Sequence, residues 1–284
     1  MHISLIEWKK QHSLGTLKPV KRKPSLTASE VCTILAGYHL SGYKCFEYYY
    51  HQLKQNHSQS LFPTMPTYKV FLCYIPKALP LMGIWALHCS YQSVRTDYYF
   101  VDSKTIEVCH IKRESQNLVF KDTAKKGKSS MGWFFGFKLH LVINHLGQIV
   151  SFVVTKGNVS DNNHDVLKKL LSNLSGLCVG DKGYQSALFE SFFESGLHLS
   201  VKPKKNMTKQ AVVSEFHARL QKKRGIIESV NDILTTVCDI EHSRHRSKAN
   251  AFAHLFGGLV AYQHLDTKPH IFIKGAQNYI QNAA

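Results

Sequence analysis

Acidic residues are scarce in this chain of 284 residues. It has 19 Asp and Glu against 36 Lys and Arg, which leaves a formal net charge of +17. This excess favours a polyanion as the partner, of which nucleic acid is the commonest. The alternative is a basic surface kept for solubility, although a net charge of roughly 2–8 is enough for that purpose on a small domain.

Cysteine pairs at C-x-x-C spacing are absent, although the chain contains seven cysteines. Their absence excludes a zinc ribbon and a thioredoxin-like redox motif. Glu7 and Trp8 lie where a secretion signal would have its apolar core, so we expect free thiols in a reducing cytosol. The apolar runs are also too short and interrupted to span a bilayer, and we expect no membrane contact.

The sequence pattern changes near residue 90, which predicts two domains over residues 1–90 and 91–284. Residues 1–24 are basic and interrupted by Pro and Gly, and we expect them to form an arm.

Short helices are predicted after this arm. The capping box from Thr27 to Glu30 begins the first, and further helices are predicted over 43–55 and from Tyr68 towards Leu79. They predict a small all-α N-terminal domain. It is either a helix-turn-helix-like DNA-binding domain or a plain helical cap on the next domain.

Short apolar strands alternate with helices from Tyr98 onwards. This order predicts an α/β fold in which helices cover the faces of a mixed sheet. The strands are expected at 98–102, 137–143, 149–155, 177–181 and 197–201, and the helices at 162–174, 186–195, 215–237 and 249–264.

Two carboxylates end predicted strands. Asp102 and Asp181 each follow a four-residue apolar run and precede a turn. One such aspartate is more often a turn or cap residue, but chemistry gathers at the carboxyl ends of strands. Two of them in one sheet of a basic protein therefore indicate oxygen ligands for Mg²⁺ or Mn²⁺.

A third carboxylate is expected from the helix predicted over 215–237. Glu228 borders the apolar stripe of this helix, and Arg224 lies one turn before it. The two residues could instead form an exposed ion pair, which would contribute little because Arg precedes Glu. The alternative that we favour is a glutamate directed towards the two aspartates.

Seven motifs follow one another between Tyr98 and Tyr262: Val101-Asp102-Ser103 with Val108-Cys109; Gly127 to His140; Thr155-x-Gly157-Asn158-x-x-Asp161; Gly180-Asp181-Lys182-Gly183-Tyr184; Lys205-Asn206-Met207; Arg224-x-x-Ile227-Glu228; and His242 to Ser247. In this order they resemble the motifs of bacterial insertion-sequence transposases of the family numbered nine hundred and eighty-two, within the DDE superfamily.

The resemblance implies an RNase H-like mixed sheet and a catalytic triad of Asp102, Asp181 and Glu228 that holds two Mg²⁺ or Mn²⁺ ions. Water would cut double-stranded DNA at the terminal inverted repeats of the element. The freed 3′-hydroxyl would then attack target DNA at the same site. By the same analogy we expect a homodimer on DNA, in the bacterial cytoplasm with the nucleoid. The alternatives are an RNase H-like nuclease without strand transfer and a decayed copy that only binds DNA.

Basic residues near these motifs are candidates for phosphate contacts, because Arg in particular binds phosphate oxygens in a bidentate manner. The alternative is a solvated basic segment. The candidates are Lys182, Arg224, Arg244 and Arg246.

Three consecutive aromatic residues, Trp133, Phe134 and Phe135, are the last ambiguous feature. They could stack on a flipped DNA base or pack within the protein. The sequence favours packing.

Overall fold

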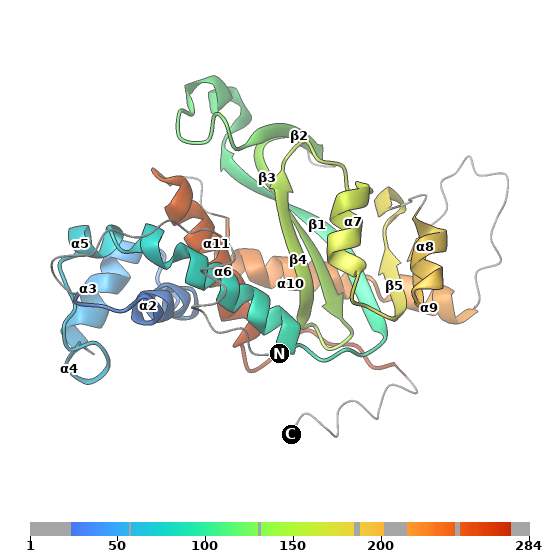
Figure 1. Cartoon of the computed structure of the whole chain (residues 1–284), viewed down its shortest axis with the longest axis horizontal. Coiled ribbons are helices and arrows are strands. Elements are labelled where there is room, and N and C mark those ends of the chain that lie inside the picture. Colours follow the sequence, from blue (N-terminus) through green and yellow to red (C-terminus); the bar gives the residue numbers. More distant parts are fainter. Residues whose placement is uncertain are drawn as a thin grey trace, which may run out of the picture.

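The computed structural model describes residues 24–56, 58–129, 132–184, 188–201, 215–241 and 245–273. Part of the sequence-based prediction lies outside these residues, namely most of the basic arm, the Lys205-Asn206-Met207 motif and Arg244. The described chain forms a curled mixed sheet that is flanked by helices (Figure 1).

The described part of residues 24–92 contains five helices, and the predicted capping box is present, with the Thr27 and Glu30 side chains each bonded to the other's backbone N–H. Buried side chains of these helices share one continuous core with the C-terminal helix and with one face of the sheet. The five helices are α2 (Ala28–Leu40), α3 (Phe46–Asn56), α4 (Ser58–Leu61), α5 (Tyr68–Leu72) and α6 (Ile75–Gln92). Their division from the rest of the chain as a domain stays a prediction.

The sheet has six strands in the order β2-β3-β1-β5-β6, and β4 also pairs with β3. The central pair β1–β5 and the pair β5–β6 are parallel, whereas β3 runs antiparallel to β1, β2 and β4. The strands are β1 (Tyr98–Cys109), β2 (Lys125–Ser129), β3 (Gly132–Asn144), β4 (Ile149–Lys156), β5 (Gly176–Gly180) and β6 (Leu197–Val201).

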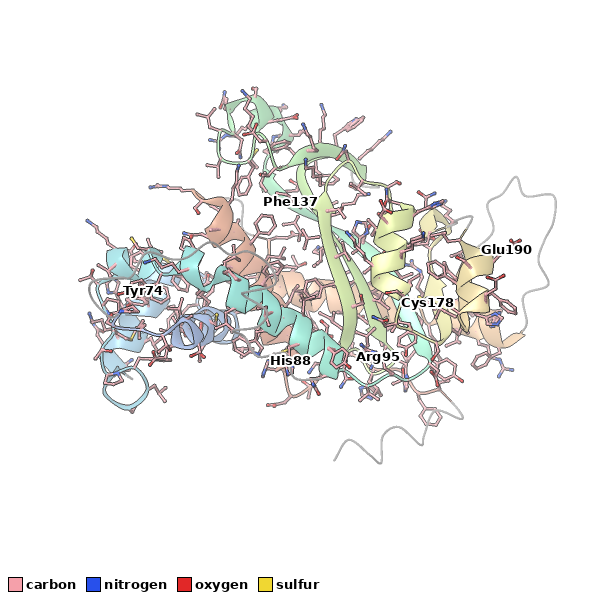
Figure 2. All side chains as sticks on the ribbon, viewed as in Figure 1. Tyr74, His88, Arg95, Phe137, Cys178 and Glu190 are labelled. Carbon is pink, nitrogen blue, oxygen red and sulfur yellow. The ribbon has the colours of Figure 1, made fainter. Side chains whose placement is uncertain are left out.

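Side-chain alternation along β3 sends residues to two different cores. Leu139 and Leu141 belong to the larger core, which includes α10 (Gly225–Thr236) and α11 (Lys248–Gln263), whereas Val142 belongs to a smaller core with α7 (His164–Leu171). On the larger-core face, the rings of Phe137 and Phe252 from α11 meet edge to face, with 5.2 Å between their centroids (Figure 2). The strand predicted over 137–143 is therefore confirmed, but its alternating pattern, which is typical of a half-buried strand, was misleading, because β3 is buried on both faces here.

The single helix predicted over 215–237 is wrong. The structure has two helices, α9 (Glu215–Lys222) and α10, joined by a turn at Lys223 and Arg224. Consecutive backbone bonds across this turn span three residues instead of four, for example from Arg224 N–H to the Gln221 carbonyl. Gly225 follows the turn, and glycine in a helix interior costs about 1 kcal/mol relative to alanine. The helix therefore tightens and restarts there.

The remaining helices are short. The chain also contains α8 (Phe189–Glu194) and two 3₁₀ turns, η1 (Ile111–Gln116) and η2 (Lys182–Tyr184). Among the described helices, none is both long and apolar enough for a membrane crossing.

Candidate active site

Asp102 lies within β1, one residue beyond the end of the β1–β5 ladder, in which Val101 is paired with Gly180. Its cross-strand partner on β3 is Leu141, whose side chain belongs to the larger core, so Asp102 is on the sheet face that α10 covers. The side chain is partly buried, and its Oδ2 accepts a hydrogen bond of 3.4 Å from Asn231 Nδ2 of α10.

Asp181 directly follows β5, immediately after the last residue of the parallel ladder with β1. Asp102 and Asp181 therefore occupy equivalent positions on adjacent strands, whose axes lie about 4.8 Å apart in a sheet. Only glycine fits before Asp181, because a Cβ on Gly180 would lie 2.9 Å from Cγ1 of Val101 and 3.3 Å from Cβ of Tyr184. The close packing of β5 against β1 fixes where Asp181 leaves the sheet.

Glu228 lies in the first turn of α10, which is anchored to the core by Ile227 and Val230. Oε1 of Glu228 accepts a bond of 2.8 Å from Nη2 of Arg224, and 61% of the Glu228 side chain is exposed. The ion-pair alternative is therefore confirmed, with the Glu228 carboxylate exposed. The direction of Glu228 towards the two aspartates stays a prediction.

The pKa of Asp102 is raised to about 6, chiefly because burial disfavours the charged carboxylate. The Ser103 backbone N–H and the Arg224 guanidinium oppose the rise in pKa, whereas the carboxylates of Asp161 and Glu228 add to it. Burial is therefore the main reason that the charged form of Asp102 is disfavoured, and the two neighbouring carboxylates contribute less. A cation bound there would favour the charged form.

The donor set of Asp102, Asp181 and Glu228 consists of carboxylate oxygens, which suits a hard divalent cation such as Mg²⁺. Their side chains, however, are not arranged as a complete metal site. Within the described residues, no three His, Cys, Asp or Glu side chains are grouped as a metal site, and Arg224 binds the Glu228 carboxylate. The three residues fit a divalent metal by chemical type, but in this structure their side chains are not grouped around one ion.

A second polar cluster lies on the opposite face of the sheet, directly behind Asp102. Oδ1 of Asp161 accepts hydrogen bonds from Ser103 Oγ at 2.8 Å and from Lys138 Nζ at 3.1 Å, and His140 Nδ1 lies 3.9 Å from it. The Lys138 side chain is only 10% exposed. We call Ser103, Lys138, His140 and Asp161 the Asp161 cluster.

The Asp161 cluster was not predicted from the sequence, although two signals were present. Lys138 and His140 occupy alternate positions of an otherwise apolar strand, and Asp161 ends one of the motifs quoted above. In the structure, Nε2 of His140 pairs with Thr155 Oγ1 at 2.9 Å, and burial lowers the pKa of His140 to about 4. Because Ser103 follows Asp102 in β1, the cluster holds the strand backbone at the candidate site.

The predicted phosphate contacts are only partly described. Lys182 in η2 and Arg246 before α11 are exposed, and Arg224 binds Glu228. Arg244 lies outside the described residues. The resemblance to transposases implies a tyrosine at position 221 and a lysine at position 235, where this chain has Gln221 and Thr235. Gln221 has a structural contact instead, because its Nε2 donates to the Ser200 carbonyl of β6 at 2.8 Å.

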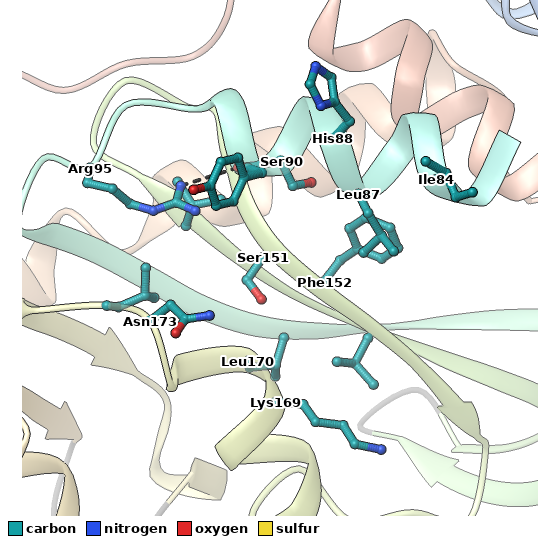
Figure 3. Close-up of a pocket in the computed structure, with 14 residues that line it drawn as sticks. Ile84, Leu87, His88, Ser90, Arg95, Ser151, Phe152, Lys169, Leu170 and Asn173 are labelled. Atoms are coloured by element: carbon teal, nitrogen blue, oxygen red, sulfur yellow. Dashed lines mark hydrogen bonds between the residues drawn. The ribbon is translucent and has the colours of Figure 1, made fainter. Parts of the chain in front are cut away.

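A groove of about 630 Å³ lies away from these carboxylates, between α6, β4 and α7 (Figure 3). Its lining is mainly apolar, with Leu87, Phe152 and Leu170 around it and with Arg95 and Lys169 at its borders. It contains no acidic side chain, so its chemistry differs from that of the carboxylate site.

Comparison with known families matches residues 92–248 to the family described as Transposase DDE domain. The matched segment extends from the end of α6 to the start of α11 and contains all the carboxylates discussed above. No curated protein and no solved structure shows significant similarity to the chain. Because the match covers more than half of the 284 residues, the chain belongs to the family of proteins with a transposase DDE domain.

Proposed function

We propose that this chain is a transposase that cleaves the DNA ends of an insertion sequence and joins them to target DNA. Within the DDE superfamily, we assign it to the insertion-sequence family numbered nine hundred and eighty-two, on the seven motifs listed in the sequence analysis. The observation that supports the chemistry is the β1–β5 register, in which Val101 pairs with Gly180, so that Asp102 and Asp181 both follow the last pair of this ladder.

Asp102, Asp181 and Glu228 would hold two Mg²⁺ or Mn²⁺ ions. When bound, such ions stabilise the charge that develops on the attacking and leaving oxygens of a phosphodiester. The chain contributes orientation: Asn231 donates to the Asp102 carboxylate, and the Asp161 cluster holds Ser103 on the opposite face of β1. Neither displacement at phosphorus requires a covalent enzyme intermediate, so one set of carboxylates serves both steps.

Arg224 has two partners in this proposal. Its guanidinium binds Glu228 in the DNA-free structure, and a DNA phosphate would compete for the same donors. Lys182, Arg244 and Arg246 would provide further phosphate contacts, in keeping with the net charge of +17. The substrate is double-stranded DNA in the bacterial cytoplasm, and a homodimer would bring two element ends together.

The test is a paired cleavage and joining assay with labelled DNA that carries the element's inverted repeat, a target plasmid and Mg²⁺. The wild-type chain should release the element end and produce a joined, longer product. Asp102→Asn should lose both reactions, whereas Glu107→Gln, an exposed carboxylate on the same strand, should retain both.

The same assay separates two other functions. Cleavage without joining would identify a nuclease. DNA binding with neither reaction, by folded wild-type protein, would identify a decayed copy that acts only as a DNA-binding protein. Equal cleavage by wild type and Asp102→Asn would remove Asp102 from the mechanism.

A further inference from the structure

The hairpin of β2 and β3 carries an exposed tryptophan. Trp133 is 57% exposed, whereas the next two residues, Phe134 and Phe135, are 2% and 3% exposed. The sequence-based preference for packing is therefore correct for the two phenylalanines and wrong for Trp133. Trp133 lies at the beginning of β3, where this strand pairs with β2 (Figure 1).

Two lysines flank this indole ring. Lys128 is the cross-strand partner of Trp133, and Lys126 is the partner of Phe135, two residues further along the same face. Their ammonium nitrogens lie 5.8 Å and 5.3 Å from the centroid of the Trp133 ring. Strand β2 contains three lysines in five residues and no acidic residue.

The ring lies on the same face of the sheet as Asp102. Counting forward along β3 in steps of two leads from Trp133 to Leu141, which is the cross-strand partner of Asp102. These eight residues span about 26 Å of strand. At about 3.4 Å per nucleotide, DNA bound at Asp102 would reach the ring within about eight nucleotides.

Nucleic acid is the partner that fits both features, because it offers a π-face for the indole ring and phosphates for the lysines. An acidic peptide would satisfy the lysines but would leave the ring without a stacking partner. Lysine side chains are flexible, so their ammonium groups can move to phosphates when a base takes the ring face.

We propose that Trp133 is a stacking platform for an unpaired base of the bound DNA, with Lys126 and Lys128 contacting the adjoining phosphates. This inference deepens the proposed function, since it rests on DNA as the substrate. In this proposal, the β2–β3 hairpin contacts the same DNA that is bound at the carboxylates. Stacking of a base on the Trp133 ring should strengthen the binding of such DNA about 10-fold or more.

The test measures DNA binding by fluorescence anisotropy in EDTA, so that cleavage does not contribute. The probes are a blunt duplex and the same duplex with a short single-stranded extension. Trp133→Ala should bind the extended DNA about 10-fold more weakly and the blunt duplex nearly as well as wild type. Trp133→Phe should retain most of the affinity. A 2-aminopurine in the extension should be quenched by wild type and not by Trp133→Ala.

Tyr91→Ala is the matched control, because Tyr91 is a 77% exposed aromatic residue on α6, among the lining residues of the groove between α6, β4 and α7. It should bind both DNAs as wild type does. Unchanged binding of the extended DNA by a folded Trp133→Ala variant would overturn the proposal, and so would an equal loss on both DNAs. Asp102→Asn separates this inference from the proposed function, since it should lose cleavage and keep binding.

Discussion

Removal of the Asp161 carboxylate should strongly destabilise the fold, because it leaves a buried ammonium group without its partner. Lys138 is only 10% exposed, and Asp161 is 31% exposed. Asp161→Ala also removes the acceptor of the Ser103 hydroxyl. Breaking a buried pair typically costs 3–5 kcal/mol, and the partial exposure of Asp161 puts the expected loss at the low end, about 3 kcal/mol of unfolding free energy.

The comparison is an exposed ion pair in the same protein. Arg224 and Glu228 are separated by 2.8 Å, less than the 3.1 Å of Lys138 and Asp161, yet 61% of the Glu228 side chain is in water. Arg224→Ala should therefore cost less than about 1 kcal/mol. The exposure of the carboxylate, and not the distance between the charged atoms, therefore determines how much each ion pair contributes to stability.

Urea unfolding of wild type and both variants measures the two losses. The double variant Lys138→Met with Asp161→Leu should be more stable than Asp161→Ala, because it removes the buried charge together with its partner. Equal losses for Asp161→Ala and Arg224→Ala would refute this reasoning. A double variant less stable than Asp161→Ala would also refute it.

Three further predictions follow from burial, backbone packing and charge. Burial, together with nearby histidines, lowers the pKa of His39 from 6.5 to about 3, so the folded state excludes a proton that the unfolded chain binds. The free energy of unfolding should therefore fall as the pH falls below 6.5, by about 1.4 kcal/mol per pH unit. In a pH series of urea unfolding, His39→Gln should remove this part of the pH dependence. An unchanged pH dependence in the variant would contradict the prediction. Gly180→Ala should cost about 1–3 kcal/mol in thermal or urea unfolding, because its Cβ would lie 2.9 Å from Val101, and a neutral effect would show that the strands can separate there. Arg244→Ala with Arg246→Ala should weaken binding to all DNA sequences similarly and reduce the slope of log affinity against log salt by about 2, while a sequence-selective loss would indicate base contacts.

Local sequence signals predicted much of the fold. The capping box at Thr27 and the strand over 137–143 depend on near neighbours, and both are confirmed. The apolar runs before Asp102 and Asp181 also lie on adjacent parallel strands, as expected of an α/β sheet. Their catalytic roles, and that of Glu228, stay predictions.

Features that depend on distant contacts were missed. Strand β2, Lys125–Ser129, has a polar sequence with no alternation and is a strand because β3 pairs with it. Strand β1 extends seven residues beyond Asp102, and this extension also pairs with β3. The Asp161 cluster joins residues as much as 58 positions apart, so no short window of sequence reveals it.

The most direct test of the central claim is Mg²⁺-dependent cleavage of inverted-repeat DNA by the three single variants Asp102→Asn, Asp181→Asn and Glu228→Gln. If these side chains act on one phosphodiester, each variant should lose about 100-fold or more in cleavage rate while binding DNA as wild type does. Wild-type cleavage by any one of the three would contradict the account.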